Sequence, residues 1–299
     1  MAEAPVIETT HLRKAYDGVE ALRGLTFAVP AGSICGFLGR NGAGKTTTIK
    51  VLLGMARRTG GTARVFGLAA DDPHDSVRIR QRTGFVSEDK DLYDVMTVEQ
   101  IIRFTAGFYP RWRKDLASQY LRTFELPAER HVRELSRGMR TRLALLLAFS
   151  RGAELLVLDE PTSGLDPAAT EEVLQAVVSH VATEGVTVFL SSHHLPDIDQ
   201  VADHIVIIDR GRAVVTGGLE DLRDAYRRIQ LVFDAEAPQP TLRAPGIVAT
   251  ERRGRVLTVL CRSGLEQVLA ELRALDAASV EVMPVTLKEI FLESVNGEN

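Results

Sequence analysis

The sequence is poor in cysteine, with only Cys35 and Cys261 among 299 residues. The two lie far apart, and neither belongs to a closely spaced cluster of the kind that binds a metal. The chain therefore gives little reason to expect a disulfide or a cysteine-ligated metal, and a reducing compartment fits. Cys35 lies in an apolar, strand-like run, where we expect it to be part of the core.

Long apolar runs are also absent. The longest covers residues 143–149, which is far shorter than the roughly 18 residues that a membrane-spanning helix needs. The first residues lack the charged segment followed by an apolar stretch that is typical of a signal peptide. We therefore expect that the chain does not cross a bilayer unaided and that any association with a membrane depends on a partner.

No excess of positive charge is present, because the net charge is −4 with 25% charged residues. Proteins that bind nucleic acid usually carry a strongly basic surface. Short basic clusters occur near residues 78–82, 111–114 and 252–255, and such clusters are mostly solvated faces. Nucleic acid is therefore not expected as a partner.

Short apolar runs alternate with helical patterns up to about residue 216, which predicts an α/β fold with a mixed, largely parallel sheet. The segment of about 93–150 is rich in helical pattern and poor in strands, so we expect it to form a helical subdomain inserted into the α/β core. The predicted strands are 6–9, 25–29, 33–38, 63–66, 84–86, 155–158, 187–190, 205–208 and 213–215, and the predicted helices are 46–53, 98–108, 116–124, 139–149, 168–182 and 195–201.

The pattern changes after about residue 223. Strands are predicted at 229–233, 256–261 and 279–285, and helices at 265–275 and 287–295, with three prolines between the first two strands. We expect two domains: a large α/β domain over residues 5–222, and a small α+β accessory domain over residues 225–299.

A phosphate-binding loop is the strongest single signal. The segment from Gly39 to Thr46 fits the pattern G-x-x-x-x-G-K-[ST] between a predicted strand and a predicted helix. Glycines let several backbone N–H groups face one anion, and the helix that follows directs its positive end at that anion. Lys45 would bring a charge to the β- and γ-phosphates of ATP, and the Thr46 hydroxyl would bind Mg²⁺. The residues expected to bind the nucleotide here are Gly39, Arg40, Asn41, Gly42, Ala43, Gly44, Lys45, Thr46 and Thr47.

A second acidic motif follows a buried strand, because four apolar residues at 155–158 run directly into Asp159 and Glu160. The carboxyl ends of parallel strands are where open α/β sheets bind ligands. We expect Asp159 to hold Mg²⁺ and Glu160 to orient and deprotonate the attacking water.

Further motifs follow in a characteristic order. Residues 135–140 read Leu-Ser-Arg-Gly-Met-Arg, residues 163–166 read Ser-Gly-Leu-Asp, and residues 191–193 read Ser-Ser-His. Together with the two phosphate-site motifs and an upstream Tyr16, this succession resembles the nucleotide-binding domain of ABC ATPases over about residues 5–222.

The resemblance implies several roles. Tyr16 matches the aromatic residue that stacks on adenine, and His193 matches a histidine near the γ-phosphate. Ser136 and Gly138 match the signature loop that contacts ATP bound to the other subunit of a dimer. Asp166 matches the loop that couples the two sites. The catalytic residues are then Glu160, His193 and Lys45, and the metal-binding residues are Thr46, Glu88 and Asp159.

Two motifs depart from the family pattern, at three positions. Glu88 stands where the family usually has glutamine, which adds a negative charge near the phosphates while keeping oxygens for Mg²⁺ or water. Arg137 and Met139 stand where the signature loop commonly has glycine and glutamine. The rate of hydrolysis and its dependence on metal are the properties that these departures affect.

Within the family, the segment 108–112, the Glu88 loop and the ending at 286–293 resemble drug- and peptide-antibiotic-export ATPases of prokaryotes. The resemblance implies an ATP-hydrolysing subunit that forms a homodimer or heterodimer and works beside a separate membrane permease, at the cytoplasmic face of the cell membrane. ATP and Mg²⁺ are the implied cofactors. Three alternatives remain: a regulatory ABC subunit of low turnover, a soluble ABC ATPase outside transport, and another phosphate-loop enzyme such as a small-molecule kinase.

Overall fold

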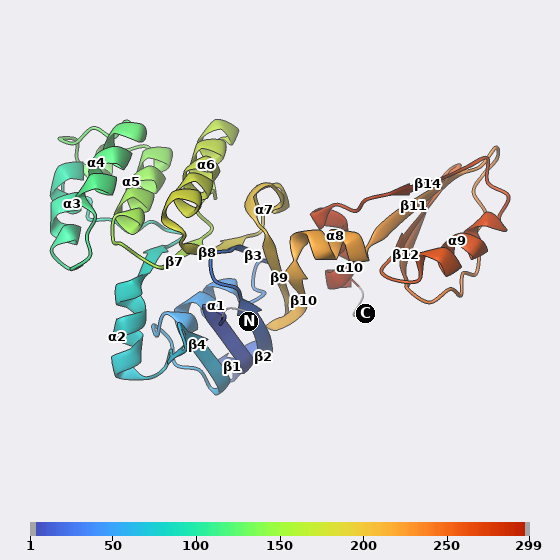
Figure 1. Ribbon diagram of the computed structural model, residues 1–299, viewed down its shortest axis with the longest axis horizontal. Helices are drawn as coiled ribbons and strands as arrows, with labels where there is room; N and C mark the ends of the chain where they lie inside the picture. The colour runs from blue at the N-terminus through green and yellow to red at the C-terminus, as the bar shows by residue number, and fades with distance from the viewer. Residues whose placement is uncertain (1–3, 297–299) are drawn as a thin grey trace. The chain divides into compact units, whose positions relative to one another are not determined.

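A computed structural model describes residues 4–296 of the chain. The chain divides into two compact units, the first ending at Thr216 and the second beginning at Gly217. The strands of each unit form separate sheets (Figure 1), and each unit has its own hydrophobic core. Helix α8 (Leu219–Ala225), which contains residue 222, therefore belongs to the second unit.

The main sheet of the first unit is six-stranded, in the order β10-β9-β3-β8-β7-β6. Strand β3 pairs in parallel with β8 and β9, and β7 pairs in parallel with β6 and β8. Every residue of β3, β7 and β8 is buried, as expected of parallel strands covered on both faces. The strands are β3 (Ile34–Gly39), β6 (Thr83–Val86), β7 (Leu155–Asp159), β8 (Thr187–Ser192), β9 (His204–Asp209) and β10 (Arg212–Gly218).

A second, antiparallel sheet has the order β2-β1-β4-β5. Its strands are β1 (Ile7–Tyr16), β2 (Val19–Val29), β4 (Gly60–Val65) and β5 (Leu68–Ala69). The mixed, largely parallel α/β architecture predicted from the sequence is confirmed.

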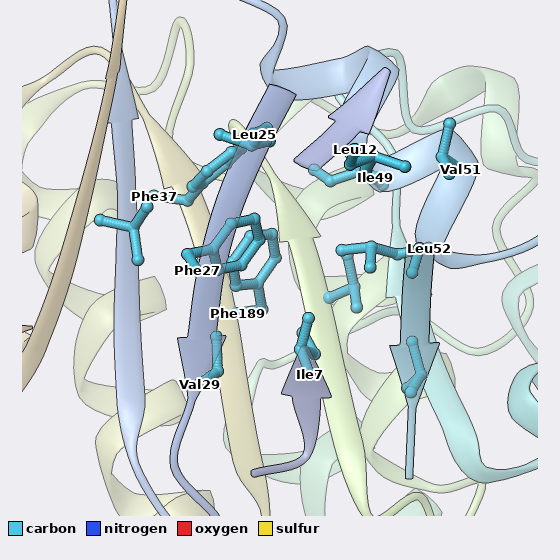
Figure 2. Packing of buried hydrophobic residues seen from close by; sticks show 14 of the residues in the cluster. Ile7, Leu12, Leu25, Phe27, Val29, Phe37, Ile49, Val51, Leu52 and Phe189 are labelled. Carbon is cyan, nitrogen blue, oxygen red and sulfur yellow. The ribbon is translucent and has the colours of Figure 1, made fainter. Parts of the chain in front are cut away.

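One core joins the two sheets and helix α1 (Lys45–Leu52). The rings of Phe27 on β2, Phe37 on β3 and Phe189 on β8 pack against one another, with centroids 4.7–5.9 Å apart. Figure 2 shows these rings beside Ile7 and Leu52 of the same cluster. This packing fixes the chain on both sides of the segment 40–44, which lies between β3 and α1.

The chain between β6 and β7 is helical, as Figure 1 shows in cyan and green. Leu116, Tyr120 and Phe149 are buried among its helices. Helices of the first unit are α2 (Pro73–Arg82), α3 (Val98–Ala106), α4 (Lys114–Thr123), the 3₁₀ helix η1 (Val132–Glu134), α5 (Arg137–Phe149), α6 (Pro167–Glu184) and α7 (Leu195–Val201). Within residues 4–296, no helix is long and apolar enough to span a bilayer.

The second unit is α+β, with an antiparallel sheet in the order β12-β13-β11-β14. Val268 and Leu272 of α9 are fully buried with Ile229 and Val259 of the sheet, so this unit has a closed core. Its elements after α8 are β11 (Arg227–Val232), β12 (Ile247–Arg253), β13 (Val256–Cys261), α9 (Leu265–Arg273), β14 (Ser279–Met283) and α10 (Leu287–Asn296).

Five of these elements have no counterpart in the sequence-based prediction: β5, α2, η1, α8 and β12. Cys35 and Cys261 are both buried and unpaired. Cys35 belongs to the core of the first unit, as predicted. Burial raises the pKa of both thiols.

Candidate nucleotide site

A polar cavity of about 490 Å³ opens where β3 ends. It brings together residues from the β3–α1 segment, from the loop after β6, and from the segments that follow β7 and β8. Its lining residues are Ala21, Arg40, Asn41, Gly42, Gly44, Lys45, Thr46, Thr47, Glu88, Glu160, Ser163 and His193.

The phosphate loop owes its shape to glycine. Gly44, the residue before α1, has φ of 111°, a value that other residues rarely adopt. A Cβ atom at Gly44 would lie 2.8 Å from Leu22 Cδ2 and 3.0 Å from the carbonyl oxygen of Ala21. The loop therefore lies directly against β2. The first turn of α1 begins at Lys45, so its free N–H groups and positive dipole end face the cavity.

Lys45 reaches back across the loop. Its buried ammonium group donates a hydrogen bond of 2.8 Å to the carbonyl oxygen of Gly39. The same nitrogen lies 3.3 Å from Glu160 Oε1, and both side chains are almost fully shielded from solvent. A buried cation is thus held beside the anion-binding loop, paired with a carboxylate that a phosphate can replace.

Asp159 is the last residue of β7 and Glu160 follows it, at the carboxyl end of the strand. Asp159 is buried and accepts a hydrogen bond from the Ser191 hydroxyl on β8. The backbone N–H of Glu160 donates to the carbonyl oxygen of Ser191 at 3.1 Å. Glu160 adopts a left-handed backbone conformation, with φ of 47°, so the strand bends there and directs the carboxylate into the cavity.

His193 completes this arrangement. Its Nδ1 atom lies 2.8 Å from Glu160 Oε2, while half of the side chain remains exposed. The Glu160 carboxylate is thus held between Lys45 on one oxygen and His193 on the other. The three residues expected to be catalytic lie together, although they come from three separate segments.

Not all expected nucleotide-binding residues line this cavity. Tyr16 lies at the end of β1 with 44% of its surface exposed, and the Lys14 ammonium lies 4.3 Å from the centre of its ring. Gly39 and Asp159 are buried and are not among the lining residues of the cavity. Ala43 is buried in the core beneath the loop.

Ser136, Gly138 and Asp166 lie at helix starts outside this cavity. The Ser136 hydroxyl accepts from the backbone N–H of Met139 at 3.2 Å and begins α5. Asp166 accepts from the backbone N–H of Ala169 at 2.9 Å and begins α6. Both are standard helix caps.

Arg137, the unusual residue of the signature loop, packs on Gly164. A Cβ atom at Gly164 would lie 2.3 Å from Arg137 Cζ. The guanidinium therefore lies directly against Gly164 of its own chain, a position that the sequence left open. Ser163 and Ala21, which the sequence-based list of site residues lacked, both line the cavity.

The donor set suits magnesium. Within residues 4–296, no group of three or more His, Cys, Asp or Glu side chains is arranged to hold a metal by itself. Mg²⁺ commonly binds one or two protein oxygens and takes its remaining ligands from phosphates and water. Thr46, Asp159 and Glu88 offer only oxygen ligands, which fits this requirement.

The glycine loop at the start of α1, its lysine and the paired carboxylates after a buried parallel strand define a phosphate-loop nucleotide-binding protein. The comparisons narrow this class. The family model described as "ABC transporter" matches residues 22–163.

Relatives match well beyond that segment. The daunorubicin/doxorubicin resistance ATP-binding protein DrrA of Streptomyces peucetius is 39% identical, over 73% of this chain and 67% of that protein. The Nod factor export ATP-binding protein I of Ralstonia nicotianae is 30% identical, over 100% of this chain and 96% of that protein. The ABC transporter ATP-binding protein YtrB of Bacillus subtilis is 29% identical, over 98% of this chain and 99% of that protein.

A solved structure, that of an ATP-binding subunit of an ABC transporter, matches with a TM-score of 0.65 and 30% identity. The match covers 73% of this chain and 92% of the chain in that structure. The chain therefore belongs to the ABC transporter family: it is the ATP-binding subunit of a transporter, and an ATPase.

Proposed function

We propose that this protein drives export through a separate membrane permease by hydrolysing ATP between two ATP-binding subunits. The observation that carries the catalytic part is the Glu160 carboxylate, held between Lys45 and His193 at the open end of the phosphate loop. The protein would be held at the cytoplasmic face of the membrane by binding to the permease.

In the proposed site, the β- and γ-phosphates of ATP lie in the loop of residues 39–47, against its backbone N–H groups. Lys45 leaves Glu160 for the phosphates, because a multiply charged anion attracts it more strongly than one carboxylate does. Thr46, Asp159 and Glu88 would hold Mg²⁺ beside the phosphates. When bound, Mg²⁺ offsets the negative charge that develops on the phosphate oxygens during transfer.

Release of Lys45 frees one carboxylate oxygen of Glu160. That oxygen would accept a proton from the water that attacks the γ-phosphate, so Glu160 acts as general base. The His193 hydrogen bond keeps the other oxygen in place and orients the carboxylate. His193 is half exposed, which leaves it within reach of the γ-phosphate.

The proposed dimer explains the residues outside the cavity. Ser136 and Gly138 lie at the start of α5, where a hydroxyl and free N–H groups can bind the γ-phosphate held by a second subunit. Asp166 would connect the two sites across the interface. Tyr16 is exposed at the end of β1, so its ring is available to stack on adenine. The second subunit would be an identical or a related chain.

The permease would dock beside α3. Tyr93, Phe104 and Phe108 form a row of edge-to-face rings with centroids 5.0–5.3 Å apart, and 39–64% of each residue is exposed. Exposed aromatic rows of this kind are typical of protein interfaces. The row begins at Tyr93, five residues after Glu88, and continues with Phe104 on α3 and Phe108 just after it, so docking there would be coupled to the γ-phosphate. Export is the direction favoured by the name of the Nod factor relative.

Steady-state ATP hydrolysis by the wild type and by Glu160→Gln, with light scattering to follow association, tests the proposal. We expect turnover by the wild type, its loss in the variant, and an ATP-trapped dimer of the variant. Glu266→Gln, an exposed glutamate on α9, is the matched control and should behave as the wild type. ATP binding without turnover by the wild type would instead support the regulatory, low-turnover subunit.

A further inference from the structure

A buried lysine lies behind the proposed general base. Lys90 follows β6 in the loop that carries Glu88, and only 5% of its surface is exposed. Its backbone N–H donates to the carbonyl oxygen of Ser87 at 3.2 Å, and its φ is 49°. The loop therefore turns back sharply and carries the lysine side chain inward. Burial lowers the pKa of Lys90, so hydrogen bonds must offset the cost of placing the ammonium there.

Two carbonyl oxygens accept those hydrogen bonds. Lys90 Nζ donates to the carbonyl oxygen of Glu88 at 3.0 Å and to that of Glu160 at 3.3 Å. The first closes the turn of the loop that carries Glu88. The second crosses from this loop to the end of β7, a separation of 70 residues in the sequence.

The hydrogen bond from Lys90 to Glu160 is important because Glu160 has a left-handed backbone conformation. A residue other than glycine rarely adopts a left-handed conformation, and keeps it only where its surroundings hold it. The backbone N–H of Glu160 donates to the carbonyl oxygen of Ser191. The carbonyl oxygen of Glu160 accepts hydrogen bonds from Lys90 Nζ and from the backbone N–H of Ser163. These bonds on both sides of the residue determine where the carboxylate points.

We propose that Lys90 is a positioning residue for ATP hydrolysis, which fixes the main chain of Glu160 and ties it to the loop that bears Glu88. Because Glu88 lines the nucleotide cavity, a movement of its loop on binding the γ-phosphate would be passed through Lys90 to the general base. The inference rests on the proposed role of Glu160. It adds a residue that no motif of the chain contains.

The test compares Lys90→Met with Lys90→Arg in purified full-length protein, using kcat, KM for ATP and the Kd of a fluorescent ATP analogue. Lys90→Met keeps the length of the side chain but donates no hydrogen bond. A misplaced general base should lower kcat about tenfold or more, while KM and Kd stay within about twofold, because the phosphate loop is untouched. Lys90→Arg, which can still donate to both carbonyl oxygens, should restore most of kcat.

Lys114→Met is the matched control, since Lys114 is exposed at the start of α4. Wild-type kcat in Lys90→Met would overturn the inference. If that variant does not fold, Lys90→Leu, which also has no hydrogen-bond donor, replaces it, and wild-type kcat in Lys90→Leu would overturn the inference too. Glu160→Gln is measured in parallel. If Glu160→Gln keeps wild-type turnover, the proposed role of Glu160 is wrong. If Glu160→Gln loses turnover while Lys90→Met keeps wild-type kcat, only the proposed role of Lys90 is wrong.

Discussion

Gly44 shows at the scale of one residue how the chain makes room for a phosphate. Its φ of 111° lies outside the range of other residues, and the space where a Cβ would lie is filled by Leu22 and by the carbonyl oxygen of Ala21. In Gly44→Ala, the methyl group should displace the loop from β2 and turn the N–H groups of α1 away from the phosphates. We expect nucleotide affinity, measured by titration with a fluorescent ATP analogue, to fall about tenfold or more, which corresponds to a loss of about 1.4 kcal/mol.

Gly24 offers the control for backbone strain alone. Its φ is 93°, but nothing lies within 4 Å of the place where its Cβ would be. Gly24→Ala should therefore lower the melting temperature while leaving nucleotide affinity nearly unchanged. Equal losses of affinity in the two variants would show that contact between the loop and β2 is not what shapes the phosphate site.

The residues of the site differ in how readily the sequence predicts them. Lys45, Glu160 and His193 each belong to a motif, and the parallel sheet brings the ends of their strands together. Ser163 lies in a motif too, but the order of motifs alone does not show which of its side chains faces the cavity. Lys90 has no signal at all, because its burial depends on a turn whose direction only the folded loop determines.

At the scale of elements, the predictions succeeded where hydrophobic periodicity was strong and failed where it was weak. Helix α2 has few apolar residues, and only Ser76 and Ile79 are buried. Its start was nevertheless marked, because Asp72 caps the helix and Pro73 follows as its first residue. Strand β12 is mostly exposed and charged, so only its pairing with β13 makes it a strand.

His180 connects three helices and should make their packing sensitive to pH. On α6 it is 2% exposed, its ring stacks on Phe149 of α5, and Nδ1 lies 3.1 Å from the Tyr120 hydroxyl on α4. Burial lowers the pKa of His180 from 6.5 to about 4. Between these values the unfolded chain binds a proton that the folded chain does not, so stability falls as the pH drops from 6.5 to 4. The full loss is about 3 kcal/mol, at 1.36 kcal/mol for each pH unit.

Urea unfolding of the wild type and His180→Phe from pH 7 to pH 4 measures this contribution. The difference in unfolding free energy between the two proteins should move in favour of the variant as the pH falls, and should level off below about pH 4. His74, which is exposed on α2, provides the control His74→Asn, for which no such trend is expected. A constant difference for His180→Phe would mean that the ring takes up its proton at the same pH in the folded and in the unfolded chain.

The aromatic row on and beside α3 is expected to matter for transport but not for hydrolysis. Tyr93, Phe104 and Phe108 do not line the nucleotide cavity. Tyr93→Ala with Phe108→Ala should therefore leave ATP turnover of the isolated chain unchanged, and should abolish transport when the chain is reconstituted with its permease in vesicles. Val178→Ala on α6, another exposed apolar position, is the control. Normal transport by the double variant would place the permease elsewhere.

At the scale of the whole molecule, the change of sequence pattern after residue 223 predicted a second unit of the observed class. The start of this unit could not be predicted from α8, because this helix has only seven residues between two strands. So short a segment does not show a helical periodicity that can be recognised in the sequence. Contacts in three dimensions place the start at Gly217 instead. A boundary of this kind depends on where a short helix packs, which neither composition nor periodicity records.

The two units should be separable in function as well as in packing. Every residue that lines the nucleotide cavity lies before Thr216, and the core of the second unit is built from its own strands and α9. A chain that ends at Gly218, the last residue of β10, should therefore fold and bind ATP with a Kd within about twofold of the full chain, as binding energy comes from local contacts. Loss of binding in a truncated chain with a normal circular dichroism spectrum would show that the second unit supports the site.

The turnover of that same truncated chain decides what the second unit does. If the unit only packs or stabilises the proposed dimer, then kcat per site at saturating protein concentration should equal that of the full chain, and only the concentration needed for dimerisation should rise. If the unit restrains the subunit, kcat should increase on its removal. Measuring hydrolysis over a range of protein concentrations separates the two effects, because association depends on concentration whereas restraint within one chain does not.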